Sequence, residues 1–264
     1  MTNSENYLDV NRELWDERTK VHMQSDFYDL PGFRKGVTSL QQIELDLLPK
    51  DLTGNDLLHL QCHFGLDTMS LSRMGASSTG VDFSPAAVEK ARELAAEMNL
   101  DATFICEDIL SFEPSKQYDI VFSSYGTVGW LRDIKEWART VNAALKPGGK
   151  FYFIEFHPIM WMLDDDFEKF HYPYSSHDVI AGSSESTYTG NELETKQSWI
   201  TWNYGFGAVV GSLLETGLKL EHFEEYDHSP YYIHDRMVET GHRQYQIKGF
   251  QGMFPLTYSL IATK

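Results

Sequence analysis

The chain has 264 residues, of which 42% are hydrophobic and 14% aromatic, enough to bury one sizeable core. Asp and Glu outnumber Lys and Arg by 39 to 22, which gives a formal net charge of −17 and a pI near 4.9. Because nucleic acids and anionic membranes are bound by clusters of Lys and Arg, this charge argues against both as partners.

The first elements in chain order are a leading helix and one strand–helix unit. Residues 11–28 are amphipathic and predict a helix that carries Trp15. Residues 56–60 have the pattern of a short buried strand, and Gly65 opens a helical stretch that stops at Gly75.

Strands and helices then alternate as far as residue 156. The expected elements are the end of a strand at 79–82, a helix over 86–98 started by Ser84 and Pro85, strands at 102–106 and 118–123, a helix over 134–145 and a strand at 150–156. From 158 to 204 the pattern breaks up, and a helix over 209–216 with strands at 218–226 and 256–262 follows. The apolar centre of 118–123 is typical of a parallel strand covered on both faces.

This alternation predicts the fold class. Right-handed crossovers between parallel strands give an α/β fold with a doubly wound, three-layer, Rossmann-like sheet, mostly parallel with an antiparallel C-terminal edge pair. We expect one domain over 1–264. Its parts are an N-terminal helical cap (1–42), a core (43–157), an insertion or lid (158–204) and the C-terminal part of the sheet (205–264).

Targeting segments, membrane spans and metal-binding motifs are features that the sequence does not display. The N-terminus has no basic leader, and no apolar run reaches the length of a membrane span. Cys62 and Cys106 lack the Cys-x-x-Cys spacing, and no histidine pair has metal-ligand spacing beside carboxylates. We therefore expect a cytoplasmic protein with reduced thiols and no metal; its oligomeric state is open.

The turn after the first strand is the first candidate binding element. It carries Gln61, His63, Gly65 and Thr68, so free N–H groups of a helix N-terminus face the crevice at the strand ends. Such a turn suits a carboxylate or a phosphate.

The next three strand ends supply further candidates. Asp82 ends the second strand, where a carboxylate accepts hydrogen bonds from both hydroxyls of a ribose, and Phe83 beside it would cover a purine ring. Asp108 and Ile109 follow the third strand. Asp108 is placed to accept a hydrogen bond from the exocyclic amine of a purine, and Ile109 is placed to line the pocket of the base. Ser123 lies near the end of the fourth strand.

Taken in order, these residues resemble the motifs of the class I S-adenosylmethionine-dependent methyltransferase superfamily. Residues 57–65 resemble its glycine-rich first motif, and the runs 118–121 and 145–150 resemble the segments at its fourth and fifth strands. The resemblance extends over 43–157 and 212–264 and is closest to the bacterial small-molecule branch. It implies that 43–157 binds S-adenosylmethionine, with Asp82 at the ribose and Asp108 and Ile109 at the adenine.

The first motif departs from the family pattern. Where the family has an acidic residue and three alternate glycines, this chain has His59, Gln61, His63 and Gly65. A dinucleotide pyrophosphate needs the missing glycines, which argues against a nicotinamide-dependent dehydrogenase. S-adenosylmethionine has no pyrophosphate, so Gln61 and His63 either point away from it or bind its carboxylate.

Two further candidates each have a plain structural alternative. Leading helices of related methyltransferases fold over the cofactor, which would place Trp15 beside it, and simple helix packing explains Trp15 equally well. His157, after the fifth strand, is placed to act as a general base, or else it bonds a nearby carbonyl group as a structural residue.

The function expected from these features is methyl transfer from S-adenosylmethionine to a small-molecule acceptor. Two alternatives stay open: a catalytically silent domain that binds an adenosyl group or a metabolite as a regulator, and the disfavoured dehydrogenase. Neither the acceptor nor its reacting atom is readable from the sequence.

Overall fold

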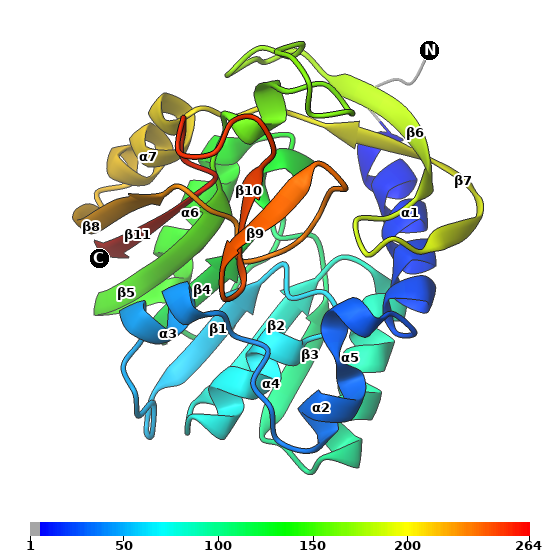
Figure 1. The fold of residues 1–264 in the computed structure, drawn as a ribbon. Coiled ribbons are helices and arrows are strands. Elements are labelled where there is room, and N and C mark those ends of the chain that lie inside the picture. Colours follow the sequence, from blue (N-terminus) through cyan, green and yellow to red (C-terminus); the bar gives the residue numbers. More distant parts are fainter. Residues whose placement is uncertain (1–5) are drawn as a thin grey trace.

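A seven-stranded sheet forms the core of the computed structural model, which describes residues 6–264 (Figure 1). The strand order is β3-β2-β1-β4-β5-β11-β8. The parallel strands are β1 (Asp56–Leu60), β2 (Ser77–Asp82), β3 (Ala102–Cys106), β4 (Tyr118–Ser124) and β5 (Leu145–Phe156). β11 (Thr257–Thr263) runs antiparallel to both β5 and β8 (Lys219–Tyr226).

The predicted α/β class and its antiparallel edge pair are confirmed. The last strand of the chain is not the outermost one, however, because β11 inserts between β5 and β8. Its residues Tyr258 and Leu260 are thereby buried as part of the sheet interior.

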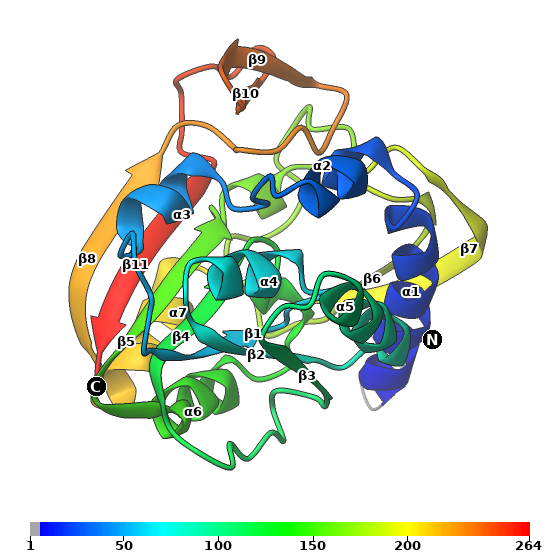
Figure 2. The ribbon, with the colours of Figure 1, turned by 90° about the horizontal axis from the view of Figure 1, so that it is seen from below.

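Helices cover both faces of the sheet (Figure 2). α6 (Ile134–Ala144) and α7 (Phe206–Glu215) pack on one face, and α3 (Gln42–Leu47) and α4 (Leu66–Arg73) pack on the other. Successive strand residues point to opposite faces, so Leu58 belongs to the α6–α7 core while Leu57 belongs to the α3–α4 core. α5 (Pro85–Glu97) packs beside α4.

The caps read from the sequence are present. The Ser84 hydroxyl accepts from the N–H of Ala87 at 3.1 Å, and Pro85 occupies the first helical position of α5. Asp133 caps α6 in the same way. α5 therefore begins directly after the end of β2, and α6 begins after the loop that follows β4.

α1 (Tyr7–His22) lies against the insertion and against the start of α5. The Asn11 amide donates to the carbonyl of Ile200 at 2.7 Å and accepts from its N–H at 2.9 Å. Asp16 accepts from the Ser84 hydroxyl and from the N–H of Ala86. Asn11 and Asp16 therefore tie the leading helix to two segments that border the strand ends. The expectation about an N-terminal leader concerns mainly residues 1–5, which lie outside the described residues.

The insertion contains two strands that the sequence pattern did not predict. β6 (Ile180–Ser186) and β7 (Glu192–Thr201) form an antiparallel ribbon that passes beside α1 (Figure 1). These strands are rich in Ser, Gly and Glu, which have low strand propensity. The ribbon is therefore stabilised by the pairing of β6 with β7 and by the contact of β7 with α1, and not by local sequence preference. A second small ribbon, β9 (Met237–Gly241) and β10 (Gln244–Ile247), was also missed.

The remaining short elements are η2 (Asp26–Tyr28) and α2 (Leu30–Arg34), which follow α1, with η3 (Val128–Trp130) after β4 and η4 (Met160–Met162) after β5. Among residues 6–264, no helix has both the length and the apolarity needed to cross a membrane.

Candidate functional site

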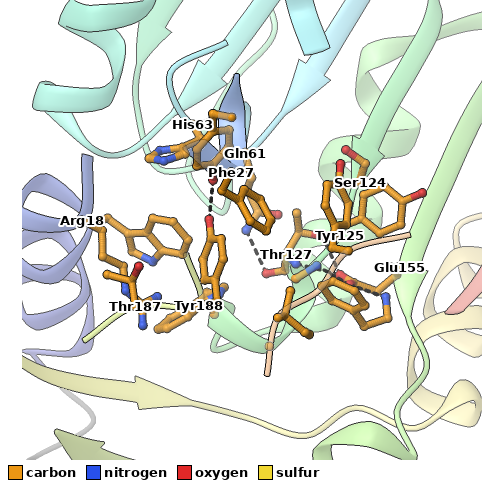
Figure 3. Close-up of a pocket in the computed structure, with 18 of the residues that line it drawn as sticks. Arg18, Phe27, Gln61, His63, Ser124, Tyr125, Thr127, Glu155, Thr187 and Tyr188 are labelled. Carbon is orange, nitrogen blue, oxygen red and sulfur yellow. Dashed lines mark hydrogen bonds between the residues drawn. The ribbon is translucent and has the colours of Figure 1, made fainter. Parts of the chain in front are cut away.

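A cavity of about 630 Å³ opens where β1, β2, β4 and β5 end. Its floor is formed by the turns that follow these strands, and its walls are formed by α1, the segment 27–41 and the β6–β7 ribbon. Figure 3 shows side chains from these separate segments facing one another across the cavity.

The turn between β1 and α4 keeps a glycine-like backbone without the usual glycines. Gln61, His63 and Gly65 all have positive φ values, of 56°, 50° and 79°. For a non-glycine residue this left-handed conformation costs about 1–2 kcal/mol, and such strain is commonly held at functional sites. At Gly65 no side chain fits, since a Cβ atom would lie 2.4 Å from the Phe104 ring. The departure from the family motif is thus one of side chains and not of backbone shape.

The side chains at these positions hold neighbouring segments in place. The Gln61 amide donates to the Thr127 carbonyl at 2.9 Å (Figure 3). His63 Nε2 lies 3.0 Å from His22 Nδ1. Gln61 Oε1 and His63 Nδ1 are buried with no protein partner in the described chain. The turn therefore contains two buried polar atoms that make no hydrogen bond within residues 6–264.

His59 takes the place of the acidic residue that usually begins the motif. Its Nδ1 atom lies 2.8 Å from the Thr68 hydroxyl, and burial lowers the pKa of His59 to about 3. A neutral histidine–threonine pair therefore stands where the family has a carboxylate.

Asp82 lines the cavity at the end of β2. Its carboxylate accepts from the N–H of His63 at 2.8 Å and from the N–H of Ser84 at 2.9 Å. Burial raises the pKa of Asp82 to about 6. Each carboxylate oxygen has a second lone pair, so Asp82 links two turns and still has acceptor capacity toward the cavity.

Six of the predicted site residues line this cavity: Trp15, Gln61, His63, Gly65, Asp82 and Phe83. Trp15 makes edge-on contacts with His63 and Trp130, at ring-centroid distances of 5.2 and 5.3 Å. The leading helix therefore reaches the cavity, as expected for a helix that folds over a ligand.

Four other predicted cofactor residues lie outside the cavity lining. Thr68 is buried behind the turn against His59, and Ser123 is buried below it. Asp108 accepts from the N–H of Leu110 in a local turn, and Ile109 is buried in the α6 side of the core. The end of β3 pairs with the end of β2, where Cys106 is the partner of Asp82, but neither Asp108 nor Ile109 lines the cavity.

His157 also lies outside the cavity lining. Its Nε2 atom lies 2.9 Å from a Glu225 oxygen, and its Nδ1 atom accepts from the N–H of Ile159 at 3.1 Å. Burial lowers the pKa of His157. With both ring nitrogens engaged, His157 joins the end of β5 to β8 and corresponds to the structural alternative.

Glu155, one residue before Phe156 at the end of β5, is a cavity residue that the sequence pattern concealed. Its carboxylate accepts from the N–H groups of Gly126, Thr127, Val128 and Phe156 and from the Thr127 hydroxyl. Burial raises the pKa of Glu155. Glu155 therefore fixes the loop that carries Tyr125, Thr127 and Trp130 into the cavity (Figure 3).

Two carboxyl groups lie at the β4 side of the cavity, of which Glu44 is fully buried and Asp67 is half-buried. Asp67, in the first turn of α4, accepts from the hydroxyls of Ser39 at 2.6 Å and Ser124 at 3.4 Å. Glu44 accepts from the Tyr125 hydroxyl at 2.8 Å, and burial raises its pKa to about 8. Burial also raises the pKa of Asp67, the member of the pair that lines the cavity.

Two neutral histidines lie at the α1 side. Burial lowers the pKa of His22 to about 2 and that of His63 to about 3. Around them stand Tyr28 and Tyr188, whose hydroxyls are hydrogen-bonded to each other. Nowhere in residues 6–264 do three or more His, Cys, Asp or Glu side chains gather so as to hold a metal ion.

Comparisons with known proteins point to one family. A family model described as a methyltransferase domain matches residues 57–149. The ubiquinone biosynthesis O-methyltransferase of Coxiella burnetii (strain Dugway 5J108-111) is 26% identical over 134 residues, which span 50% of this chain and 57% of that protein. The chain thus matches little more than half the length of this curated relative.

Solved structures share the whole architecture. An S-adenosylmethionine-dependent methyltransferase from Mesorhizobium loti has a TM-score of 0.58 at 19% identity, covering 88% of this chain and 100% of the other. One from Clostridium acetobutylicum has a TM-score of 0.56 at 16% identity, covering 92% and 94%. At these identities the likeness shows the fold. The methyltransferase domain match is confined to residues 57–149, which run from β1 into the start of β5.

Proposed function

We propose that this protein transfers the methyl group of S-adenosylmethionine to a small-molecule acceptor. The observation that carries the proposal is one cavity that joins the left-handed β1–α4 turn to the carboxylate of Asp82. An adenosyl group needs a turn whose backbone it can approach closely, which the β1–α4 turn would supply. It also needs a hydrogen-bond acceptor for its sugar, which Asp82 would supply.

The residues present fit this cofactor. Asp82 would accept from the ribose hydroxyls while keeping its bonds to the two turns. Phe83 would lie against the base, and the free N–H groups at the start of α4 would face the carboxylate of the methionine part. Gln61 Oε1, buried and without a protein partner, would accept from the ammonium group.

The chemistry asks little of the protein beyond alignment. When bound, S-adenosylmethionine supplies a methyl group on a positively charged sulfur that departs as a neutral thioether. Burial holds His22 and His63 neutral, so these two side chains would add no positive charge of their own to that of the cofactor. α1 and the β6–β7 ribbon exclude water and orient the acceptor.

A base is required only where the acceptor must lose a proton. Asp67 is a cavity carboxylate whose pKa is raised by burial, which suits it to take that proton. The name of the Coxiella burnetii relative favours an oxygen nucleophile. The acidic surface, with a net charge of −17, favours a small molecule over a nucleic acid.

Titration calorimetry with S-adenosylmethionine, S-adenosylhomocysteine and NAD tests the cofactor, and methyl-labelled S-adenosylmethionine with a panel of phenols, carboxylic acids and amines tests the transfer. We expect both adenosyl compounds to bind, NAD not to bind, and label to appear in one acceptor class. Preference for NAD would contradict the proposal, and tight adenosyl binding without transfer to any acceptor would favour the silent binding domain.

A further inference from the structure

Arg18 is a buried arginine whose charge has no protein partner. It is 8% exposed, and its Nε atom is buried without a hydrogen-bond acceptor. Within residues 6–264 no carboxylate or carbonyl oxygen is bonded to its guanidinium. Arg34, by contrast, pairs with Glu97 at 2.8 Å on the surface.

Two tryptophans hold the Arg18 guanidinium at the cavity wall. Its central carbon lies 5.0 Å from the ring centroid of Trp15 and 5.3 Å from that of Trp130. Stacking of this kind leaves the N–H edges of the guanidinium free, and Arg18 lines the cavity. Arg18 is therefore rigidly placed with its donors available to a ligand.

An arginine in this state is costly to the ligand-free protein. A buried charge without a partner loses its hydration and gains only the cation–π contacts in return. Burial lowers the pKa of Arg18, but an arginine side chain stays charged in proteins. A favourable arrangement requires an anion that enters the cavity.

The position of Arg18 indicates which molecule supplies the anion. Arg18 projects from α1 next to Thr187 of the β6–β7 ribbon, on the side of the cavity away from Ser124 and Tyr125 (Figure 3). In the proposed function, the carboxylate of the methionine part would instead face the N–H groups at the start of α4, on the side of Asp67 and Ser124. Arg18 is left for the acceptor.

Aromatic side chains form much of the cavity lining near Arg18. Phe27, Tyr28 and Tyr188 contact one another, and all three line the cavity. Flat apolar walls of this kind suit a planar ring.

We propose that Arg18 binds a carboxylate or phosphate group of the methyl acceptor, so that the acceptor is a planar, aromatic anion. This inference rests on the proposed function, because it assigns the acceptor part of the same cavity.

The test compares Arg18→Met with Arg34→Met, which also removes one arginine charge but lies outside the cavity. Binding of benzoate, phenyl phosphate and neutral benzamide is measured calorimetrically on protein saturated with S-adenosylhomocysteine. We expect the wild type to bind benzoate or phenyl phosphate at least tenfold more tightly than benzamide. Arg18→Met should lose this preference, Arg34→Met should keep it, and Arg18→Lys, which keeps the charge, should keep part of it.

Two readouts that do not involve the anion separate the possible roles of Arg18. Arg18→Met should melt no lower than the wild type without ligand, and should bind S-adenosylhomocysteine with unchanged affinity. A large drop in melting temperature would make Arg18 a structural residue, and a tenfold loss of S-adenosylhomocysteine affinity would assign it to the cofactor; either result overturns the inference. The inference is also overturned if the wild type binds benzoate and phenyl phosphate no more tightly than benzamide.

Failure of the proposed function looks different. In that case the wild type itself does not bind S-adenosylhomocysteine, whatever the behaviour of the Arg18 variants.

Discussion

Replacing Glu155 by glutamine should destabilise the protein far more than its near-identical shape suggests. One carboxylate oxygen accepts from the N–H groups of Gly126 and Phe156, and the other accepts from the N–H groups of Thr127 and Val128 and from the Thr127 hydroxyl. In Glu155→Gln one of these oxygens becomes an NH2 group, which cannot accept.

The size of the effect follows from the donors that lose their acceptor. In either orientation of the amide, at least two buried N–H groups are left unpaired, at about 1–3 kcal/mol each. The free energy of unfolding should therefore fall by about 2–6 kcal/mol, measured by urea denaturation at pH 7. S-adenosylhomocysteine should also bind more weakly, because the loop that carries Tyr125 and Thr127 is released.

The matched control is Glu221→Gln, which removes a carboxylate from an exposed pair with Lys150. It should change the unfolding free energy far less, since exposed ion pairs contribute little. If Glu155→Gln proves as mild as this control, the hydrogen-bond cluster does not hold the loop and the reasoning is wrong.

Three further changes test other parts of the structure. Asp82→Asn should weaken S-adenosylhomocysteine binding about tenfold or more in calorimetry, because a charged acceptor for the sugar is lost; unchanged affinity in a folded variant would refute the assignment of Asp82. Asn11→Ala removes both bonds to Ile200, so limited proteolysis should cleave the β6–β7 ribbon faster, and equal cleavage rates would show that α1 does not stabilise it. Glu44→Gln tests the buried carboxyl group through the pH dependence of unfolding. Burial raises the pKa of Glu44 to about 8, so its contribution to stability is complete below about pH 4.5 and is lost as the pH rises toward 8. Relative to the wild type, Glu44→Gln should therefore gain stability between pH 5 and pH 8, by up to about 1.4 kcal/mol per pH unit, and parallel pH curves would contradict this.

Much of the sheet was predictable because its signals are local. The apolar run at 118–123 and the Ser84-Pro85 start of α5 specify their elements within a few residues, and Asp82 at a strand end marks the crevice. The β6–β7 ribbon was not predictable, since its Ser-, Thr- and Glu-rich strands are stabilised by pairing and by contact with α1.

The cavity residues were harder to predict because their environment is tertiary. A positive φ at Gln61 has no signal in residue type, and the enrichment of histidine in this conformation is too small to predict it at His63. The sequence did not single out Arg18 or His22, although their spacing with Leu14 places all three on the buried face of α1. Asp108 has the expected position in the chain, but its carboxylate accepts from the N–H of Leu110 in a local turn, and it does not line the cavity.

A crystal structure of the protein with S-adenosylhomocysteine tests the account most directly. We expect the adenosyl group in the cavity at the ends of β1, β2 and β4, with both ribose hydroxyls within about 3 Å of the Asp82 carboxylate. An adenosyl group bound elsewhere, or a ribose that does not contact Asp82, would contradict the account.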